Sequence, residues 1–106
     1  MSLASQILKF SDLIQYQSGS IVSKVIVKQK GGNVTLFAFD AGQELSEHTA
    51  PFDALVQVLD GNAQITIAGQ PFEVSAGESI LMPAGIPHAL KAMKRFTMLL
   101  TMIRGE

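Results

Sequence analysis

The chain has 106 residues, of which 47% are hydrophobic and 16% charged, and its net charge is −1. This length suits one domain with one core, and this composition excludes a disordered chain. The lysines are scattered, so no basic stripe for nucleic acid is present, and the absence of cysteine excludes disulfides and thiolate metal sites.

The first ten residues, MSLASQILKF, lack a basic segment followed by a continuous apolar run. We therefore expect no secretory signal. No apolar run in the chain reaches the roughly 18 residues that indicate a membrane span. A cytoplasmic protein with no membrane partner is the expectation. Between Leu8 and Tyr16 the apolar spacing predicts a short N-terminal segment that is extended or helical for one or two turns.

From Gly19 onward the chain consists of short runs rich in Val, Ile, Thr and Phe, separated by Gly, Pro or Asn. Such runs, alternating between apolar and polar positions, are typical of β-strands. Seven or eight of them predict an all-β sandwich or barrel. We expect a single domain over residues 1–106, with its core between about residues 19 and 103.

Three groups of residues predict tight reversals between these strands, because each contains residues that tolerate a positive φ. They are Gly31-Gly32-Asn33, Asp60-Gly61-Asn62 and Ala68-Gly69-Gln70.

The last predicted strand, residues 96–103, is apolar on both faces. Phe96, Met98, Leu100 and Met102 share one face, and Leu99 and Ile103 lie on the other with two threonines. A lone small barrel buries only one face of a strand. The second face is therefore expected to pack on the N-terminal segment or on a second subunit, and we predict a homodimer.

Two stretches carry motifs: GQELSEHTAPFDALVQVLDG from Gly42 and GESILMPAGIPHALKA from Gly77. They resemble the two signature stretches of the cupin superfamily. The matching positions are Gly42, His48 and Gly61 in the first stretch, and Gly77, Pro83, Gly85 and His88 in the second. The resemblance implies a cupin double-stranded β-helix (jelly-roll) barrel of the small, single-domain bacterial kind.

The same comparison shows where the chain departs from the family pattern. In the family, two histidines and a glutamate of the first stretch and the histidine of the second bind one divalent metal. Here Ala50 occupies the second histidine position and Ala54 the glutamate position, and Ala92 replaces the asparagine of the second stretch. The resemblance implies His48 and His88 as the remaining metal ligands.

Asp53 and Gln57 are the nearby candidates for a substitute oxygen ligand, although strict alternation from Ala54 places Gln57 on the opposite face of its strand. For Asp53 the favoured interpretation is a turn residue that bonds backbone amides. The cofactor expectation is one divalent transition metal, Zn, Ni, Fe or Mn, or no metal at all.

We expect His48 and His88 to face one cavity at the mouth of the barrel. Its walls are predicted to be largely apolar, which suits a mostly apolar small molecule with one or two polar groups. The expected lining is His48, Ala50, Ala54, Val56, Val58, Met82, His88 and Leu90.

Three functions stay open from the sequence. The favoured one is a small-molecule binding protein with weak or no metal binding. The alternative is a metal-dependent enzyme, such as a dioxygenase or isomerase, that uses His48, His88 and a substitute oxygen ligand. The third is a dimeric structural protein with a vestigial pocket. Fold alone does not separate them, because one fold carries many functions.

Overall fold

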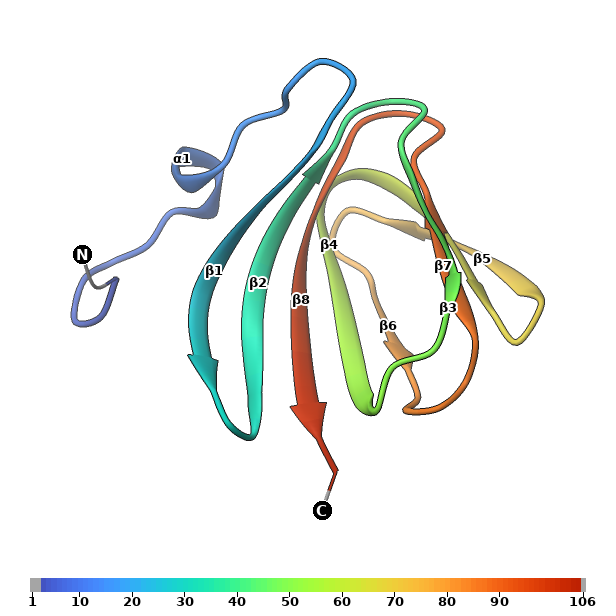
Figure 1. Cartoon of the computed structure of the whole chain (residues 1–106). Coiled ribbons are helices and arrows are strands. Elements are labelled where there is room, and N and C mark those ends of the chain that lie inside the picture. Colours follow the sequence, from blue (N-terminus) through green and yellow to red (C-terminus); the bar gives the residue numbers. More distant parts are fainter. Residues whose placement is uncertain (1–2, 106) are drawn as a thin grey trace.

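The structure is a computed structural model that describes residues 3–105, and it confirms an all-β fold with a short N-terminal helical segment (Figure 1). No helix in this part of the chain is long and apolar enough to cross a membrane. The elements are α1 (Phe10–Leu13), β1 (Ile21–Gln29), β2 (Gly32–Phe39), β3 (Glu44–His48), β4 (Phe52–Ile67), β5 (Gln70–Ser75), β6 (Ser79–Met82), β7 (His88–Lys91) and β8 (Phe96–Arg104).

Two antiparallel sheets curl around one interior. The first sheet runs in the order β1-β2-β8-β4-β6, and the second runs β5-β4-β7-β3. Strand β4 belongs to both, because residues 52–61 pair with β8 and residues 62–67 pair with β5 and β7. Figure 1 shows the two sheets facing each other across the barrel.

The passage of β4 between the sheets corrects one sequence prediction. Asp60-Gly61-Asn62 is not a reversal; the strand continues through it, and its register against β8 shifts between Val58 and Asp60. Such a bulge bends a strand. Gly61 has a φ of +76°, and the backbone of Arg95 lies where a Cβ at position 61 would stand. The sequence Asp-Gly-Asn suits a bulge as well as a turn, since both require a positive φ.

The other two predicted reversals are present as hairpins. Ala68 and Gly69, between β4 and β5, have φ values of 51° and 81°, as a two-residue turn with positive φ at both positions requires. Gly31 lies in the turn between β1 and β2.

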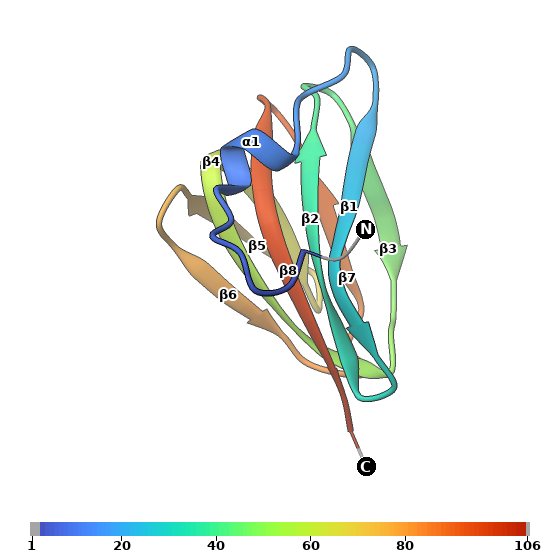
Figure 2. The same cartoon turned by 90° about the vertical axis from the view of Figure 1, so that its left-hand side faces the viewer.

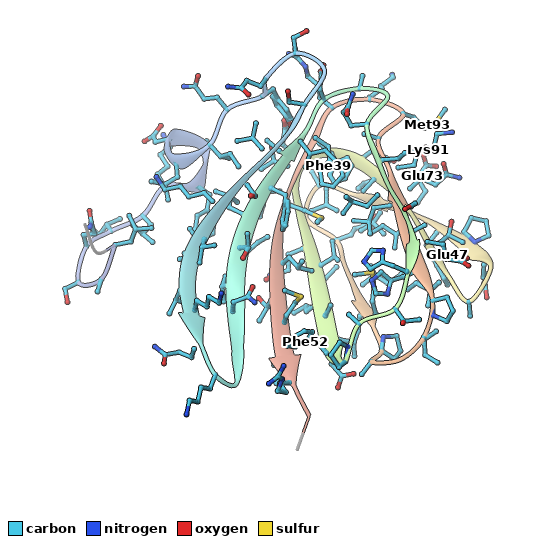
Figure 3. All side chains as sticks on the ribbon, in the orientation of Figure 1. Phe39, Glu47, Phe52, Glu73, Lys91 and Met93 are labelled. Carbon is cyan, nitrogen blue, oxygen red and sulfur yellow. The ribbon has the colours of Figure 1, made fainter. Side chains whose placement is uncertain are left out.

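The core fills the space between the sheets. Phe39 and Phe96 stack there with ring centroids 4.4 Å apart, and Figure 3 shows Phe39 pointing inward. Burying each large apolar side chain contributes roughly 1.5–3 kcal/mol. The fully or almost fully buried members are Phe39, Ala54, Val56, Val58, Ala63, Ile65, Val74, Met82, Leu90, Ala92, Phe96 and Met98.

The N-terminal segment covers part of the outer face of the first sheet (Figure 2). Ile14 is buried there with Leu36 and Ala38, and Leu99 of β8 packs against this cluster. The Tyr16 hydroxyl donates to Asp60 Oδ2 at 2.7 Å and anchors the segment to β4. The outer face of β8 therefore packs in part on the N-terminal segment, while Ile103 remains 60% exposed. The homodimer stays a prediction.

Replacing Gly61 by alanine should destabilise the fold far more than replacing Gly77. Both glycines have a positive φ, but only Gly61 faces backbone atoms within reach of a Cβ. Gly77→Ala should lower the free energy of unfolding by about 1–3 kcal/mol, the usual cost of a left-handed non-glycine residue. Gly61→Ala should exceed about 4 kcal/mol or prevent folding. Urea denaturation of both variants measures this, and equal losses would contradict the account of β4.

Candidate functional site

A small cavity of about 70 Å³ lies between the sheets, and both histidines contribute to it. Of the predicted lining, Val56 and Val58 are instead part of the packed core and do not line the cavity. The remaining six predicted residues do. The complete lining is Leu45, His48, Ala50, Ala54, Met82, His88, Leu90, Met98, Leu100 and Met102.

His48 and His88 stand side by side on paired strands. His48 ends β3 and His88 begins β7, and the two are register partners. Their ring planes meet at 71°, and their Nε2 atoms are 3.2 Å apart. His88 is buried, with 5% of its surface exposed, whereas His48 is exposed. His48 therefore forms the entrance, and His88 lies behind it.

Hydrogen bonds to the backbone fix the tautomer of each imidazole. His48 Nδ1 lies 2.7 Å from the carbonyl oxygen of Ser46, and His88 Nδ1 lies 3.2 Å from that of Ile86. A carbonyl oxygen only accepts, so each Nδ1 carries the hydrogen and donates it. In the neutral rings both Nε2 atoms then carry lone pairs, and these converge at 3.2 Å. The pair attracts a proton, a hydrogen-bond donor or a cation.

Burial is the main cause that lowers the pKa of His88 below its usual value, and the nearby His48 lowers this pKa further. The hydrogen bond to the Ile86 carbonyl opposes this by favouring the charged ring. Burial therefore favours the neutral, accepting form of the His88 ring.

The loop that precedes His88 is fixed to the β3–β4 connection. The Gly85 amide donates to the carbonyl oxygen of Ala50 at 2.9 Å. The Ala84 amide donates to Asp53 Oδ1, also at 2.9 Å. Asp53 therefore acts here as a backbone-bonding residue, which was one of its two sequence interpretations, and its carboxylate positions the loop that carries His88.

The two candidate oxygen ligands lie away from the histidines. Asp53 and Gln57 both alternate with the inward-facing Ala54 on β4 and do not line the cavity. Within residues 3–105 no group of three or more His, Cys, Asp or Glu side chains could hold a metal ion. The donors at the histidine pair thus do not fit a divalent metal held by three imidazoles and a carboxylate.

Four lining residues were not predicted: Leu45, Met98, Leu100 and Met102. The last three alternate along β8 on the face of the buried Phe96, so extending that face to the cavity would have found them. Leu45 had no such signal. A register irregularity between Leu45 and His48 places both on the inner face, which strict alternation forbids.

Four hollows on the described part of the chain are larger than this cavity. One, of about 450 Å³, separates α1 from the outer face of β4 and β8, and its polar groups Tyr16, Asp60 and Thr97 hydrogen-bond one another. Another, of about 440 Å³, lies over β3 and β7, where Glu47 and Lys91 face outward (Figure 3). None of the four is lined by a histidine, so both histidines belong to the inner cavity.

Comparison with known proteins places this barrel in a family. Residues 35–104 match the family described as the cupin domain. The chain belongs to the cupin superfamily. A conserved protein of unknown function from Streptococcus pyogenes has the same fold, with 37% identity, a TM-score of 0.91, and coverage of 96% of this chain and 90% of that one.

Two further relatives are matched over a smaller share of their own length. A cupin 2 conserved barrel domain protein from Leptotrichia buccalis is 42% identical, with a TM-score of 0.86, over 89% of this chain and 46% of that one. An uncharacterized protein of Streptomyces coelicolor is 31% identical over 62 residues, which are 58% of this chain and 59% of that protein. This cupin chain therefore matches somewhat more than half of the length of the Streptomyces coelicolor protein.

The lowered pKa of His88 predicts acid sensitivity. Above the pKa of histidine in the unfolded chain, near 6.5, His88 is neutral in both the folded and the unfolded state. The contribution of His88 to the free energy of unfolding is then fully present. As the pH falls below about 6.5, the unfolded chain takes up a proton that the folded protein resists, so the free energy of unfolding decreases. Urea denaturation at pH 7.5 and 5.5 should show this decrease, and His88→Leu should reduce it. Equal pH dependence in both proteins would contradict the assignment.

Proposed function

We propose that this cupin binds a small, mostly apolar molecule at the barrel mouth, with His48 and His88 contacting its polar atom. The observation that carries the proposal is the convergence of the two Nε2 atoms, 3.2 Å apart, at the edge of the cavity. Two acceptors at one point favour a ligand that presents a hydroxyl or amine hydrogen.

The rest of the lining supports binding in preference to catalysis. Apart from the histidines, the lining side chains are those of alanine, leucine and methionine. They include no hydroxyl, thiol or carboxylate that could act as a nucleophile. The alternative function, a metal-dependent dioxygenase or isomerase, requires an oxygen ligand, and Asp53 and Gln57 lie outside the cavity.

The size of the cavity limits the ligand. A volume of about 70 Å³ compares with roughly 30 Å³ per water molecule and with about 300–1,000 Å³ for ordinary ligand pockets. The ligand consequently has few non-hydrogen atoms. At a ceiling of about 1.5 kcal/mol per atom, four atoms provide about 6 kcal/mol, which lies between millimolar and micromolar affinity.

Propan-1-ol is a suitable probe, because it has four non-hydrogen atoms and one donor. Its isomer methoxyethane has the same composition and no donor. In ¹⁵N-labelled, metal-free protein, propan-1-ol should shift the imidazole Nε2 resonances with a dissociation constant in the millimolar range, and methoxyethane should bind more weakly. Ala54→Leu, which fills the cavity and leaves both histidines, should abolish the shift.

Met93→Leu is the matched control, since Met93 is 66% exposed and lies outside the cavity. It should bind propan-1-ol as the wild type does. Equal shifts with both isomers, or binding that survives in Ala54→Leu, would overturn the proposal.

A further inference from the structure

Three methionine side chains line the same cavity as the two histidines: Met82, Met98 and Met102. Met82 and Met98 are almost completely buried. Buried methionines commonly fill gaps in a core, but here their thioethers share a cavity wall with imidazoles.

Two of these methionines flank the position that lacks its acidic side chain. Ala54 on β4 pairs with Met82 of β6 on one side and with Met102 of β8 on the other. Side chains directly opposite each other on antiparallel strands have Cβ atoms about 4.5–5.5 Å apart. Because alanine ends at Cβ, the flexible methionine side chains can extend over position 54 toward the histidines.

The donor atoms of this lining are uniform in kind. Its side chains offer imidazole nitrogens and thioether sulfurs, and no oxygen. Hard cations such as Mg²⁺, Ca²⁺ and Mn²⁺ prefer oxygen ligands, whereas thioethers select Cu(I). The histidines fit the same role, because metal-binding imidazoles usually donate their other N–H to a carbonyl or carboxylate, and both Nδ1 atoms here face carbonyl oxygens.

We propose that this cavity is a Cu(I) site in which His48 Nε2, His88 Nε2 and the thioethers of Met82 and Met102 bind the ion. This goes beyond the proposed function and rests on it in one respect, the use of the histidine pair as the ligand-binding element. A Cu(I) ion placed between the two Nε2 atoms relieves the opposition of their lone pairs.

The cavity size and surroundings agree with this assignment. A volume of about 70 Å³ accommodates a metal ion, or about two water molecules, between the side chains that line the cavity. Leu45, Leu90 and Leu100 enclose the donors and keep bulk water from competing for the ion. The exposed His48 at the entrance provides the first contact for a copper ion delivered from solution.

The test is an anaerobic Cu(I) titration of the full chain in competition with bicinchoninate, with Zn²⁺ in a parallel titration. The wild type should bind one Cu(I) per chain and prefer it to Zn²⁺. Loss of an outer-shell partner already costs roughly 10- to 100-fold in metal affinity. Met82→Leu with Met102→Leu should therefore cost at least that much for Cu(I). Met93→Leu, with its exposed methionine, should change nothing.

Methionine-to-leucine exchange keeps the side-chain volume and is usually tolerated, and circular dichroism verifies folding. X-ray absorption of the wild-type copper complex supplies a second readout that needs no variant: copper–sulfur scattering is expected. Copper bound through nitrogen and oxygen alone, or affinity unchanged in the double methionine variant, would overturn the proposal.

The two proposals fail in different ways. If Cu(I) binding depends on His48 and His88 but not on the methionines, the proposed thioether ligation is wrong. The proposal that the histidine pair binds a ligand then still stands. The same holds if propan-1-ol binds to the metal-free protein and Cu(I) does not bind at all. If the double variant His48→Ala with His88→Leu binds both propan-1-ol and Cu(I) as tightly as the wild type does, both proposals are wrong.

Discussion

The bend of β4 at Gly61 is the constraint on which the rest of the structure depends. One strand supplies ten residues to the first sheet and six to the second, so the two sheets cannot separate without breaking it. The bend is possible because Gly61 has no Cβ. The backbone of Arg95 can therefore occupy the place where any other residue would carry one. Strand β4 pairs with β5, β6, β7 and β8, so the side chains that these strands direct into the interior depend on its position.

The histidine cavity is a direct result of that arrangement. The first half of β4 carries Ala54 between Met82 and Met102, while the second half pairs with β7, which begins at His88. The methionine and histidine side chains therefore line one cavity from opposite sheets. Alanine at positions 50 and 54 leaves that cavity open, and the buried aromatic stack of Phe39 and Phe96 fills the barrel elsewhere.

Much of the fold follows from the sequence, because alternation and glycine positions report directly on strands and turns. Those signals predicted the β-strands and two of the three reversals, while the inward direction of Ala54 was implied by the cupin resemblance. They misassigned Gly61, since a positive φ serves a bulge as well as a turn. The distinction depends on where β8 lies, and β8 is far away in the chain.

The site was less accessible to sequence reasoning for a related physical reason. The spacing of His48 and His88 indicated a shared location, but the tautomer of each ring depends on carbonyl groups of Ser46 and Ile86 that only the folded loops bring into place. Met102 lies on a strand that is apolar on both faces, and its inner side is identified only when it is grouped with the buried Phe96 on the same face. Asp53 could be a ligand or a loop anchor until the Ala84 amide was found bonded to it.

Strand β3 has a consequence for the kinetics of ligand entry. It is the last strand of its sheet, and within residues 3–105 it pairs with β7 alone, through three register pairs interrupted by an irregularity. Edge segments that make few contacts open locally, and the free energy of this opening is far lower than that of the core. An opening confined to β3 would move His48 and leave His88 in place, because β7 is also paired to β4. The proposed ligand could then enter the cavity without unfolding of the barrel.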